Sequence, residues 1–223
     1  MEQQVKTGKC IIMAAGDFTP VEIDVKDEDY VIAADGGFLY CSLVNVLPDM
    51  IVGDMDSVDS SVKAELLQWK EENPDRFVLL PTIKDDTDTL AAIRIGLEKG
   101  YRKFHIYGAM GGRLEHSMAN IQCLTYLKEN DAVGYLMDAS CMVTVIKDEA
   151  IHFNKNLTGY LSVFSLGDQA VGVNETGLKY TLDQATVTNA FPVGISNEFI
   201  GEEAVVSVEK GTLLVIVSWA EED

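Results

Sequence analysis

Two short acidic segments carry the residues of this sequence best suited to chemistry. The first is Gly-Asp-Met-Asp-Ser at Gly53 to Ser57, and the second is Asp-Asp-Thr-Asp at Asp85 to Asp88. Aspartates this close together can reach one hard cation, and Mg²⁺ prefers carboxylate oxygens, water and substrate phosphates. The alternative is an Asx turn or a helix cap, in which one side chain accepts backbone N–H groups. A cap needs one acid, whereas clustered carboxylates repel one another unless a cation or solvent relieves them. We therefore favour a Mg²⁺ site that faces the phosphates of a nucleotide.

A glycine-rich segment, Gly108 to His116, offers a second kind of chemistry. Glycines let main-chain N–H groups approach a phosphate, and the N-terminus of a following helix favours an anion. Arg113 adds a charge-assisted fork, and it alone of the four arginines stands in a glycine-rich segment. The alternative is an ordinary glycine turn in which Glu115 complements the helix dipole. His116 and Asn120 are four residues apart, so both lie on one helix face, although an isolated histidine is more often structural.

Several familiar signatures are absent from the sequence. It contains no P-loop, no dinucleotide fingerprint, no His-Glu-x-x-His and no nucleophile elbow. A phosphate-transferring enzyme with this sequence is therefore not of the P-loop class.

The elements that must position these segments alternate along the first 140 or so residues. Short runs of continuous hydrophobicity indicate strands buried on both faces of a parallel sheet, and the stretches between them indicate helices. Ligands of such sheets bind where strands end, and Asp35-Gly36-Gly37, both acidic segments and the glycine-rich segment each follow a strand. The expected strands are 10–14, 30–34, 50–52, 77–80, 104–107 and 133–137, and the expected helices are 37–44, 60–72, 88–99 and 114–130.

The pattern changes after Ser140. Helical stretches disappear, and runs rich in Val, Thr, Leu and Ile alternate with turn signals, which is typical of a small β-sandwich or barrel. The expected strands there are 160–164, 186–189, 204–208 and 213–218. We therefore expect an N-terminal, mostly parallel α/β domain at 1–140 and an all-β sandwich domain at 141–223.

Composition limits the classes of function. The chain has 223 residues, 47% of them hydrophobic, and a formal net charge of −19. That charge argues against a nucleic-acid partner, since phosphate backbones are held by clustered Lys and Arg, although acidic residues can also simply keep a protein soluble. No apolar run reaches the roughly 20 residues of a membrane span, and the polar start lacks a signal-peptide core, so we expect a cytoplasmic protein. Four scattered cysteines favour buried thiols over a zinc site.

The combination of segments resembles the thiamin pyrophosphokinase family, bacterial type. Four segments carry the resemblance in the right order at predicted strand ends, and two more resemble parts of the family's β domain, so that it extends from Ala14 to about Ser218. The first four are Ala34 to Gly37, Gly53 to Ser57, Lys84 to Asp88 and Gly111 to His116 with Asn120, and the other two are Gly177 to Tyr180 and Ile195 to Glu198. One departure is Glu115, where the family's glycine-rich motif usually has aspartate.

The resemblance implies an Mg²⁺-dependent transfer of the pyrophosphoryl group of ATP to the hydroxyl of thiamine, giving thiamine diphosphate and AMP. It also implies a homodimer with shared active sites, in which the α/β domain binds ATP and the β domain binds thiamine. Two rival functions are pyrophosphoryl transfer to another alcohol such as a pterin, and a non-catalytic nucleotide- or thiamine-binding sensor.

The resemblance also assigns residues to roles. Asp54, Asp56 and Asp85 bind the metal, with Asp88 as the alternative third ligand. These carboxylates, Asp88 and Arg113 are the expected catalytic residues, and Ser196 and Asn197 contact thiamine. The ATP site would be lined by Asp35, Gly36, Gly37, Ser57, Thr87, Gly111, Gly112, Arg113, His116 and Asn120.

Overall fold

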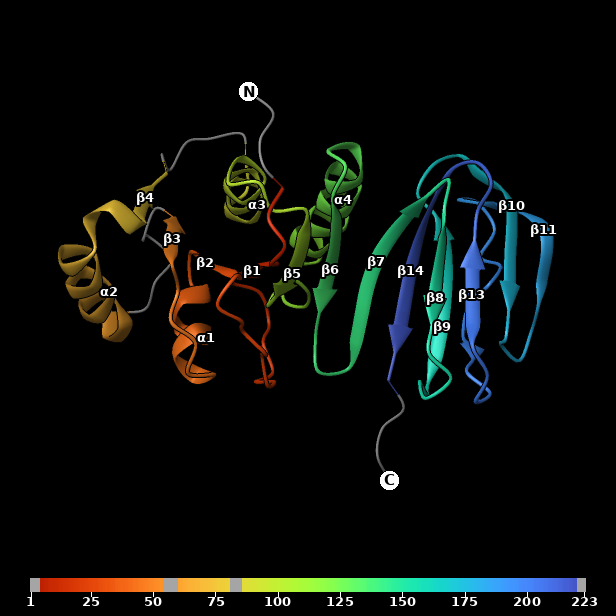
Figure 1. Ribbon diagram of the computed structural model, residues 1–223, viewed down its shortest axis with the longest axis horizontal. Coiled ribbons are helices and arrows are strands. Elements are labelled where there is room, and N and C mark those ends of the chain that lie inside the picture. Colours follow the sequence, from red (N-terminus) through yellow and green to blue (C-terminus); the bar gives the residue numbers. More distant parts are fainter. Residues whose placement is uncertain (1–4, 54–59, 81–85, 220–223) are drawn as a thin grey trace. The chain divides into compact units, whose positions relative to one another are not determined.

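A computed structural model describes residues 5–53, 60–80 and 86–219 (Figure 1). The chain forms two compact units, residues 1–139 and 140–223. Asp54, Asp56, Ser57 and Asp85, which the sequence predicts as site residues, lie outside the described residues.

The first unit is built on parallel strands in the order β6-β5-β1-β2-β3-β4. β1, β2 and β3 are almost wholly buried, and β5 is buried except at Lys103 and His105, which explains the continuous apolar runs in the sequence. The strands overlap those predicted: β1 (Cys10–Met13), β2 (Tyr30–Ala34), β3 (Met50–Gly53), β4 (Phe77–Leu79), β5 (Lys103–Tyr107) and β6 (Val133–Met137).

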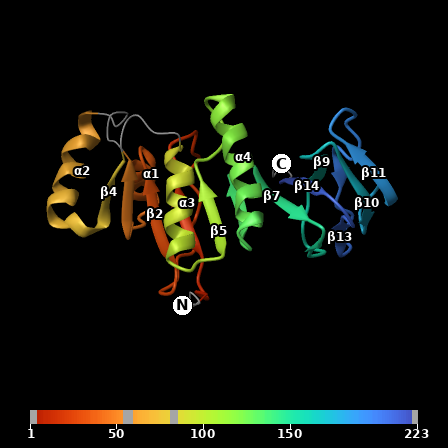
Figure 2. The same cartoon turned by 90° about the horizontal axis from the view of Figure 1, so that it is seen from above.

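Helices cover both faces of this sheet (Figures 1 and 2). On one face, Phe38 of α1 and Leu66 of α2 pack with Ile11 and Met13 of β1. On the other face α3 lies so close that a Cβ on Gly96 would be 2.6 Å from the Phe104 ring. The predicted helices are found as α1 (Gly37–Leu43), α2 (Ser60–Glu72), α3 (Asp88–Glu98) and α4 (Leu114–Glu129), and a 3₁₀ turn, η1 (Pro74–Arg76), precedes β4.

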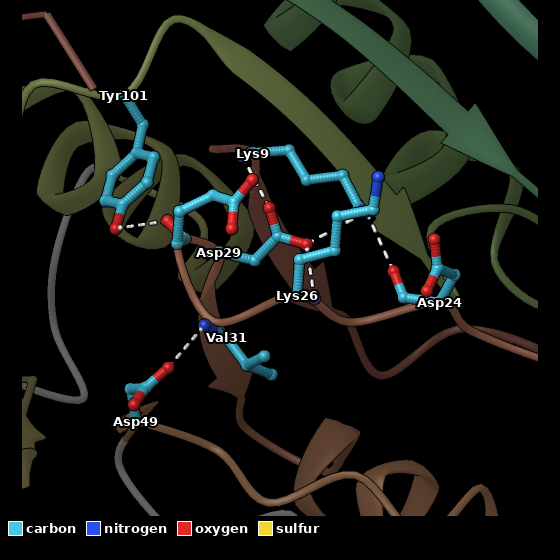
Figure 3. Close-up of polar contacts among 8 residues, drawn as sticks. Lys9, Asp24, Lys26, Asp29, Val31, Asp49 and Tyr101 are labelled. Atoms are coloured by element: carbon cyan, nitrogen blue, oxygen red, sulfur yellow. Dashed lines mark hydrogen bonds and ion pairs between the residues drawn. The ribbon is translucent and has the colours of Figure 1, made fainter. Parts of the chain in front are cut away.

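At the amino-terminal edge of the sheet, carboxylates accept hydrogen bonds from backbone N–H groups (Figure 3). Asp29, just before β2, accepts the N–H groups of Lys9 at 2.8 Å and Lys26 at 3.0 Å and pairs with the Lys9 ammonium at 2.9 Å. Asp49, just before β3, accepts the N–H of Val31 at 2.9 Å. Burial alone would raise the pKa of Asp29, but these hydrogen bonds and the Lys9 charge lower it below its usual value. These acids therefore stabilise the fold. The candidate site is to be sought at the opposite, carboxyl-terminal edge of the sheet.

The second unit contains two antiparallel sheets that share one core. Within this unit, one layer consists of strands paired in the order β12-β9-β14-β7, and the other is the sheet β11-β10-β13-β8. Val163 and Val215 of the first sheet join Val173 and Val206 of the second in a single buried cluster. The strands are β7 (Cys141–Lys147), β8 (Ala150–Phe153), β9 (Tyr160–Ser165), β10 (Gln169–Thr176), β11 (Leu182–Thr188), β12 (Asn197–Glu198), β13 (Ala204–Ser207) and β14 (Thr212–Ser218).

Candidate active site

Asp35 stands at the carboxyl end of β2, beside the end of β3. Its φ of 51° is left-handed, which is uncommon for a residue other than glycine and is found in turns and functional sites. Its N–H donates to Val52 O at 2.8 Å, and a Cβ on Gly53 would be 3.1 Å from the Asp35 Cα. The half-buried Asp35 therefore lies beside Gly53, the last residue of β3 and the first of the Gly53 to Ser57 segment.

Gly36 and Gly37 carry the chain from Asp35 into α1. A Cβ on Gly37 would collide with the carbonyl oxygen of Met13 in β1, so only glycine allows α1 to begin here. Gly36 is the N-cap of α1, so no side chain occupies that position. The glycine pair therefore brings backbone close to the sheet edge next to Asp35.

The glycine-rich segment forms the turn between β5 and α4. Gly111 and Gly112 have φ values of +79° and +61°, a conformation that favours glycine. Arg113 is the N-cap of α4, and its Nη2 and Glu115 Oε1 are 2.7 Å apart. A backbone hydrogen bond within Glu115 and the Arg113 guanidinium lower the pKa of that exposed carboxyl. The longer acid at position 115 thus pairs with the arginine, and both side chains and His116 remain exposed.

Asn120 supports the glycine-rich turn from within the protein. Its side chain is only 7% exposed, and its Nδ2 donates to the carbonyl oxygen of Ala109 at 2.7 Å. The bond joins the second turn of α4 to the residue just after β5 and Gly108. In this structure the Asn120 amide therefore holds the turn in place, whereas His116, four residues earlier, faces solvent.

Asp17 was not predicted from the sequence, yet it binds the same turn. Its Oδ2 accepts the N–H of Gly112 at 2.8 Å, and its own N–H donates to Met110 O at 3.1 Å. Next to it, Gly16 N–H donates to Gly108 O at 2.7 Å, and the Tyr40 hydroxyl donates to Gly16 O at 2.6 Å. The loops after β1 and β5 are thus joined into one structure. The signal that could have found Asp17 is its place after a buried strand, which it shares with Asp35.

At the start of α3 the capping interpretation holds for part of the second acidic segment. Thr87 is the N-cap, and its Oγ1 accepts the N–H of Leu90 at 3.2 Å. Asp86, directly before this N-cap, forms an ion pair with Arg94 of α3. Asp88 lies half-buried in the first turn, where a carboxylate favours the helix dipole.

The structure does not test the metal ligands themselves. Among the described residues no three His, Cys, Asp or Glu side chains lie close enough to hold a metal ion. The predicted ligands Asp54, Asp56 and Asp85 lie outside those residues. What the described part supplies is Asp35, directly after β2, and Asp88, in the first turn of α3 after β4, both of them oxygen donors of the kind Mg²⁺ prefers.

In the second unit, Ser196 and Asn197 differ sharply in exposure. Ser196 is exposed, with a left-handed φ of 55°, and its N–H donates to Ser162 Oγ at 3.0 Å. Asn197 is only 3% exposed, and its amide binds Glu175 Oε2 at 2.5 Å and Tyr180 O at 2.6 Å. Only Ser196 of this pair presents its side chain to solvent.

Comparison with known proteins decides the family. The family model described as the catalytic domain of thiamin pyrophosphokinase matches residues 22–135, and that of its vitamin B1 binding domain matches residues 148–213. The chain belongs to the thiamin pyrophosphokinase family. The predicted family and enzyme class are confirmed, and the family's reaction is pyrophosphoryl transfer from ATP to thiamine. Enzymes that use ATP generally need a divalent metal.

Relatives and solved structures of thiamin pyrophosphokinases agree with this assignment. Thiamine pyrophosphokinase of Bacillus subtilis (strain 168) is 26% identical over 188 residues, which are 84% of this chain and 86% of that protein. Thiamine pyrophosphokinase 1 of Oryza sativa subsp. japonica is 27% identical over 75% of this chain and 64% of its own length. A crystal structure of the Bacillus subtilis enzyme superposes with a TM-score of 0.84 at 25% identity, covering 96% of this chain and all of that one. None of the described helices is long and apolar enough to cross a membrane.

Proposed function

We propose that this thiamin pyrophosphokinase binds MgATP at the carboxyl-terminal edge of its parallel sheet and thiamine beside Ser196. One observation carries the ATP part of the proposal. Asp35 adjoins the end of β3, where Asp54 follows in the chain, and the loops after β1 and β5 are bonded to each other at the same edge. In open α/β sheets this edge is where ligands bind.

Asp54, Asp56 and Asp85 are the proposed Mg²⁺ ligands, with Asp88 as the alternative third ligand. Their carboxylate oxygens suit a hard cation, and Gly53 leads from β3 into Asp54 next to the left-handed Asp35. When bound there, Mg²⁺ would supply positive charge that neutralises part of the negative charge of the phosphates. Asp88 lies in the first turn of α3, which follows β4, and β4 pairs with β3.

The phosphates of ATP would lie against the glycine-rich turn. Gly111 and Gly112 allow close approach to the backbone there. Exposed Arg113 can exchange its exposed partner Glu115 for a phosphate at little cost, because surface ion pairs are weak. His116 follows on the exposed side of α4. The remaining proposed lining residues are Asp35, Gly36, Gly37, Ser57, Thr87 and Asn120, the last two of which act through the cap of α3 and the carbonyl of Ala109.

The chemical step needs alignment and charge neutralisation more than covalent catalysis. The thiamine hydroxyl oxygen forms a bond to the β-phosphorus of ATP, while the bond from that phosphorus to the bridging oxygen of AMP breaks. AMP leaves with the electron pair, and Arg113 stabilises the charge of the phosphates. The hydroxyl proton passes to a carboxylate, for which we propose Asp88.

Thiamine is a cation, and the proposed pocket at Ser196 lies in the second unit of an acidic chain. We propose that the protein is a homodimer whose active sites are shared between subunits, so that Ser196 and Asn197 of one copy serve the ATP site of the other. Sedimentation of the protein with and without both substrates tests the dimer, and a monomer that turns over at full rate would refute it.

The decisive experiment is incubation with MgATP and thiamine, followed by separation of the nucleotides. AMP formed in a one-to-one ratio with thiamine diphosphate supports the proposal. ADP would indicate an ordinary kinase, unchanged ATP would indicate a binding module, and AMP formed only with a pterin alcohol would indicate the other pyrophosphokinase.

The metal assignment is tested by Asp54→Asn, with Asp75→Asn in the exposed turn η1 as a matched control. We expect Asp54→Asn to abolish turnover at any Mg²⁺ concentration while the far-UV circular dichroism spectrum is kept. The control should follow the Mg²⁺ dependence of the unmodified protein. Normal activity of Asp54→Asn at limiting Mg²⁺ would overturn the metal assignment.

A further inference from the structure

Glu175 of β10 is a buried carboxyl group with an unusual set of partners. Its side chain has no exposed surface, and its Oε2 accepts a hydrogen bond from Asn197 Nδ2 at 2.5 Å. Within the described part of the chain, the buried Oε1 has no hydrogen-bond partner. Burial raises the pKa of Glu175, and the hydrogen bond from Asn197 acts in the opposite direction. A buried polar group that is only half satisfied is costly, so its presence calls for a reason.

Asn197 uses its whole side chain to join three segments. Its Nδ2 donates to Glu175 and also to Tyr180 O at 2.6 Å. Its Oδ1 accepts the N–H of Tyr180 at 2.9 Å and that of Glu198 at 3.0 Å. The side chain therefore ties β10, the turn before β11 and the start of β12 together, and Glu175 is its only side-chain partner among the described residues.

The residues before Asn197 are held in a conformation that needs such support. Ser196 is left-handed, with a φ of 55°, a state that is unfavourable for a non-glycine residue and persists only where the surroundings impose it. Gly194, with a φ of +83°, packs directly over Glu175, since a Cβ there would be 3.4 Å from Oε1 and 2.6 Å from Val163 Cγ2. The Ser196 N–H donates to Ser162 Oγ at 3.0 Å, and the Ser196 residue is exposed.

We propose that Glu175 is a positioning residue for thiamine, which holds Asn197 and thereby fixes the conformation of Ser196. This inference rests on the proposed role of Ser196 in binding thiamine. An apolar side chain at position 175 would fill the space but would leave one Asn197 N–H without an acceptor in a place that excludes water. The turn would then adopt other conformations for part of the time. Thiamine, which needs the original conformation, would bind more weakly in proportion to the fraction of molecules that have left it.

Three substitutions of Glu175 separate its acceptor oxygen from its carboxyl group and its length. Glu175→Leu removes the acceptor, Glu175→Gln keeps an acceptor oxygen in an amide, and Glu175→Asp keeps the carboxyl group but shortens the reach to Asn197. We expect Glu175→Leu and Glu175→Asp to raise the KM for thiamine by about tenfold with the KM for ATP changed less than twofold. Glu175→Gln should stay within about threefold of the unmodified protein for both substrates.

A general weakening of the second unit is controlled by Ile151→Ala. Ile151 lies on β8, an edge strand that β13 separates from β10, and it packs against the same core. We expect that variant to melt at lower temperature without a selective change in the thiamine KM. A thiamine KM that is unchanged in Glu175→Leu, or that rises equally in Ile151→Ala, would overturn the inference. If Glu175→Leu does not fold, Glu175→Asp decides the matter by the same criterion.

Failure of the inference and failure of the proposed function give different results. If Ser196→Ala leaves the thiamine KM of the active enzyme unchanged, the proposed thiamine contact is wrong and Glu175 has nothing to position. If Ser196→Ala raises that KM but neither Glu175→Leu nor Glu175→Asp does, the contact stands and the positioning role is refuted.

Discussion

Removing the buried amide of Asn120 should weaken both the first unit and its glycine-rich turn. The Nδ2 of Asn120 donates to Ala109 O at 2.7 Å, and both residues are buried, at 7% and 3% exposure. In Asn120→Ala that carbonyl oxygen loses its partner away from solvent, which costs about 1–3 kcal/mol. Alanine's better helix propensity returns at most about 0.7 kcal/mol of this. We therefore expect the free energy of unfolding to fall by about 1.5 kcal/mol.

Asn130→Ala is a matched control on the same helix. Asn130 Nδ2 also donates to a backbone carbonyl, that of Tyr126, at 2.8 Å, but it lies at the exposed C-cap of α4. Its loss should change the unfolding free energy by no more than about 0.5 kcal/mol, as is usual for surface positions.

Thermal unfolding followed by circular dichroism at 222 nm measures the difference. The α-helices among the described residues all belong to the first unit, so this signal reports on that unit. At about 2–4 °C per kcal/mol for a chain of this size, Asn120→Ala should melt about 3–6 °C lower and Asn130→Ala at most about 1–2 °C lower. Because the turn is released, the KM for ATP should also rise about fivefold or more in Asn120→Ala alone. Equal melting temperatures for the two variants would refute the reasoning from burial.

Three further predictions concern single hydrogen-bonded groups. Asp17→Ala should raise the KM for ATP but not that for thiamine in steady-state kinetics, because the Gly112 N–H loses its acceptor. An unchanged KM for ATP would show that the glycine-rich turn keeps its conformation without Asp17. The folded pKa of Asp29 is lowered, so its contribution to stability is present above its unfolded pKa of about 4 and is lost as the pH falls through the folded value. Asp29→Asn should therefore flatten the acid side of a plot of melting temperature against pH, and an unaltered slope would contradict this. Thr87→Ala should cost about 1 kcal/mol in denaturant unfolding through loss of the α3 cap, with Thr87→Ser close to the unmodified protein, and equal losses in both would exclude the cap as the cause.

The elements of the first unit were predictable because local signals agreed with the tertiary environment. Its strands are buried on both faces and therefore appear as continuous apolar runs, and α3 ends just before Gly100, the kind of helix-ending signal that sequences carry. In the second unit the predicted strands overlap β9, β11, β13 and β14, but β7, β8, β10 and β12 were not predicted. β10 shows why: Gly172, Asn174 and Glu175 interrupt its alternation, and its pairing with β11 has register shifts. Its strand conformation depends on partners distant in the sequence.

By itself the sequence determined the chemistry available to this protein. The types and spacing of the acidic and glycine-rich segments, each after a buried strand, predicted a MgATP site. The resemblance that these segments carry, with two more in the second unit, predicted the family. Only the tertiary structure decided which polar groups face solvent and which form hydrogen bonds inside the protein. Asn120 and Asn197 look like ligands in the sequence, yet both amides are used internally, by Ala109 and by Glu175 and Tyr180. Asp17 and Glu175 gain their significance from residues about 95 and 22 positions away in the chain. Such partners are set by how strands pair and loops meet, and no local pattern records this.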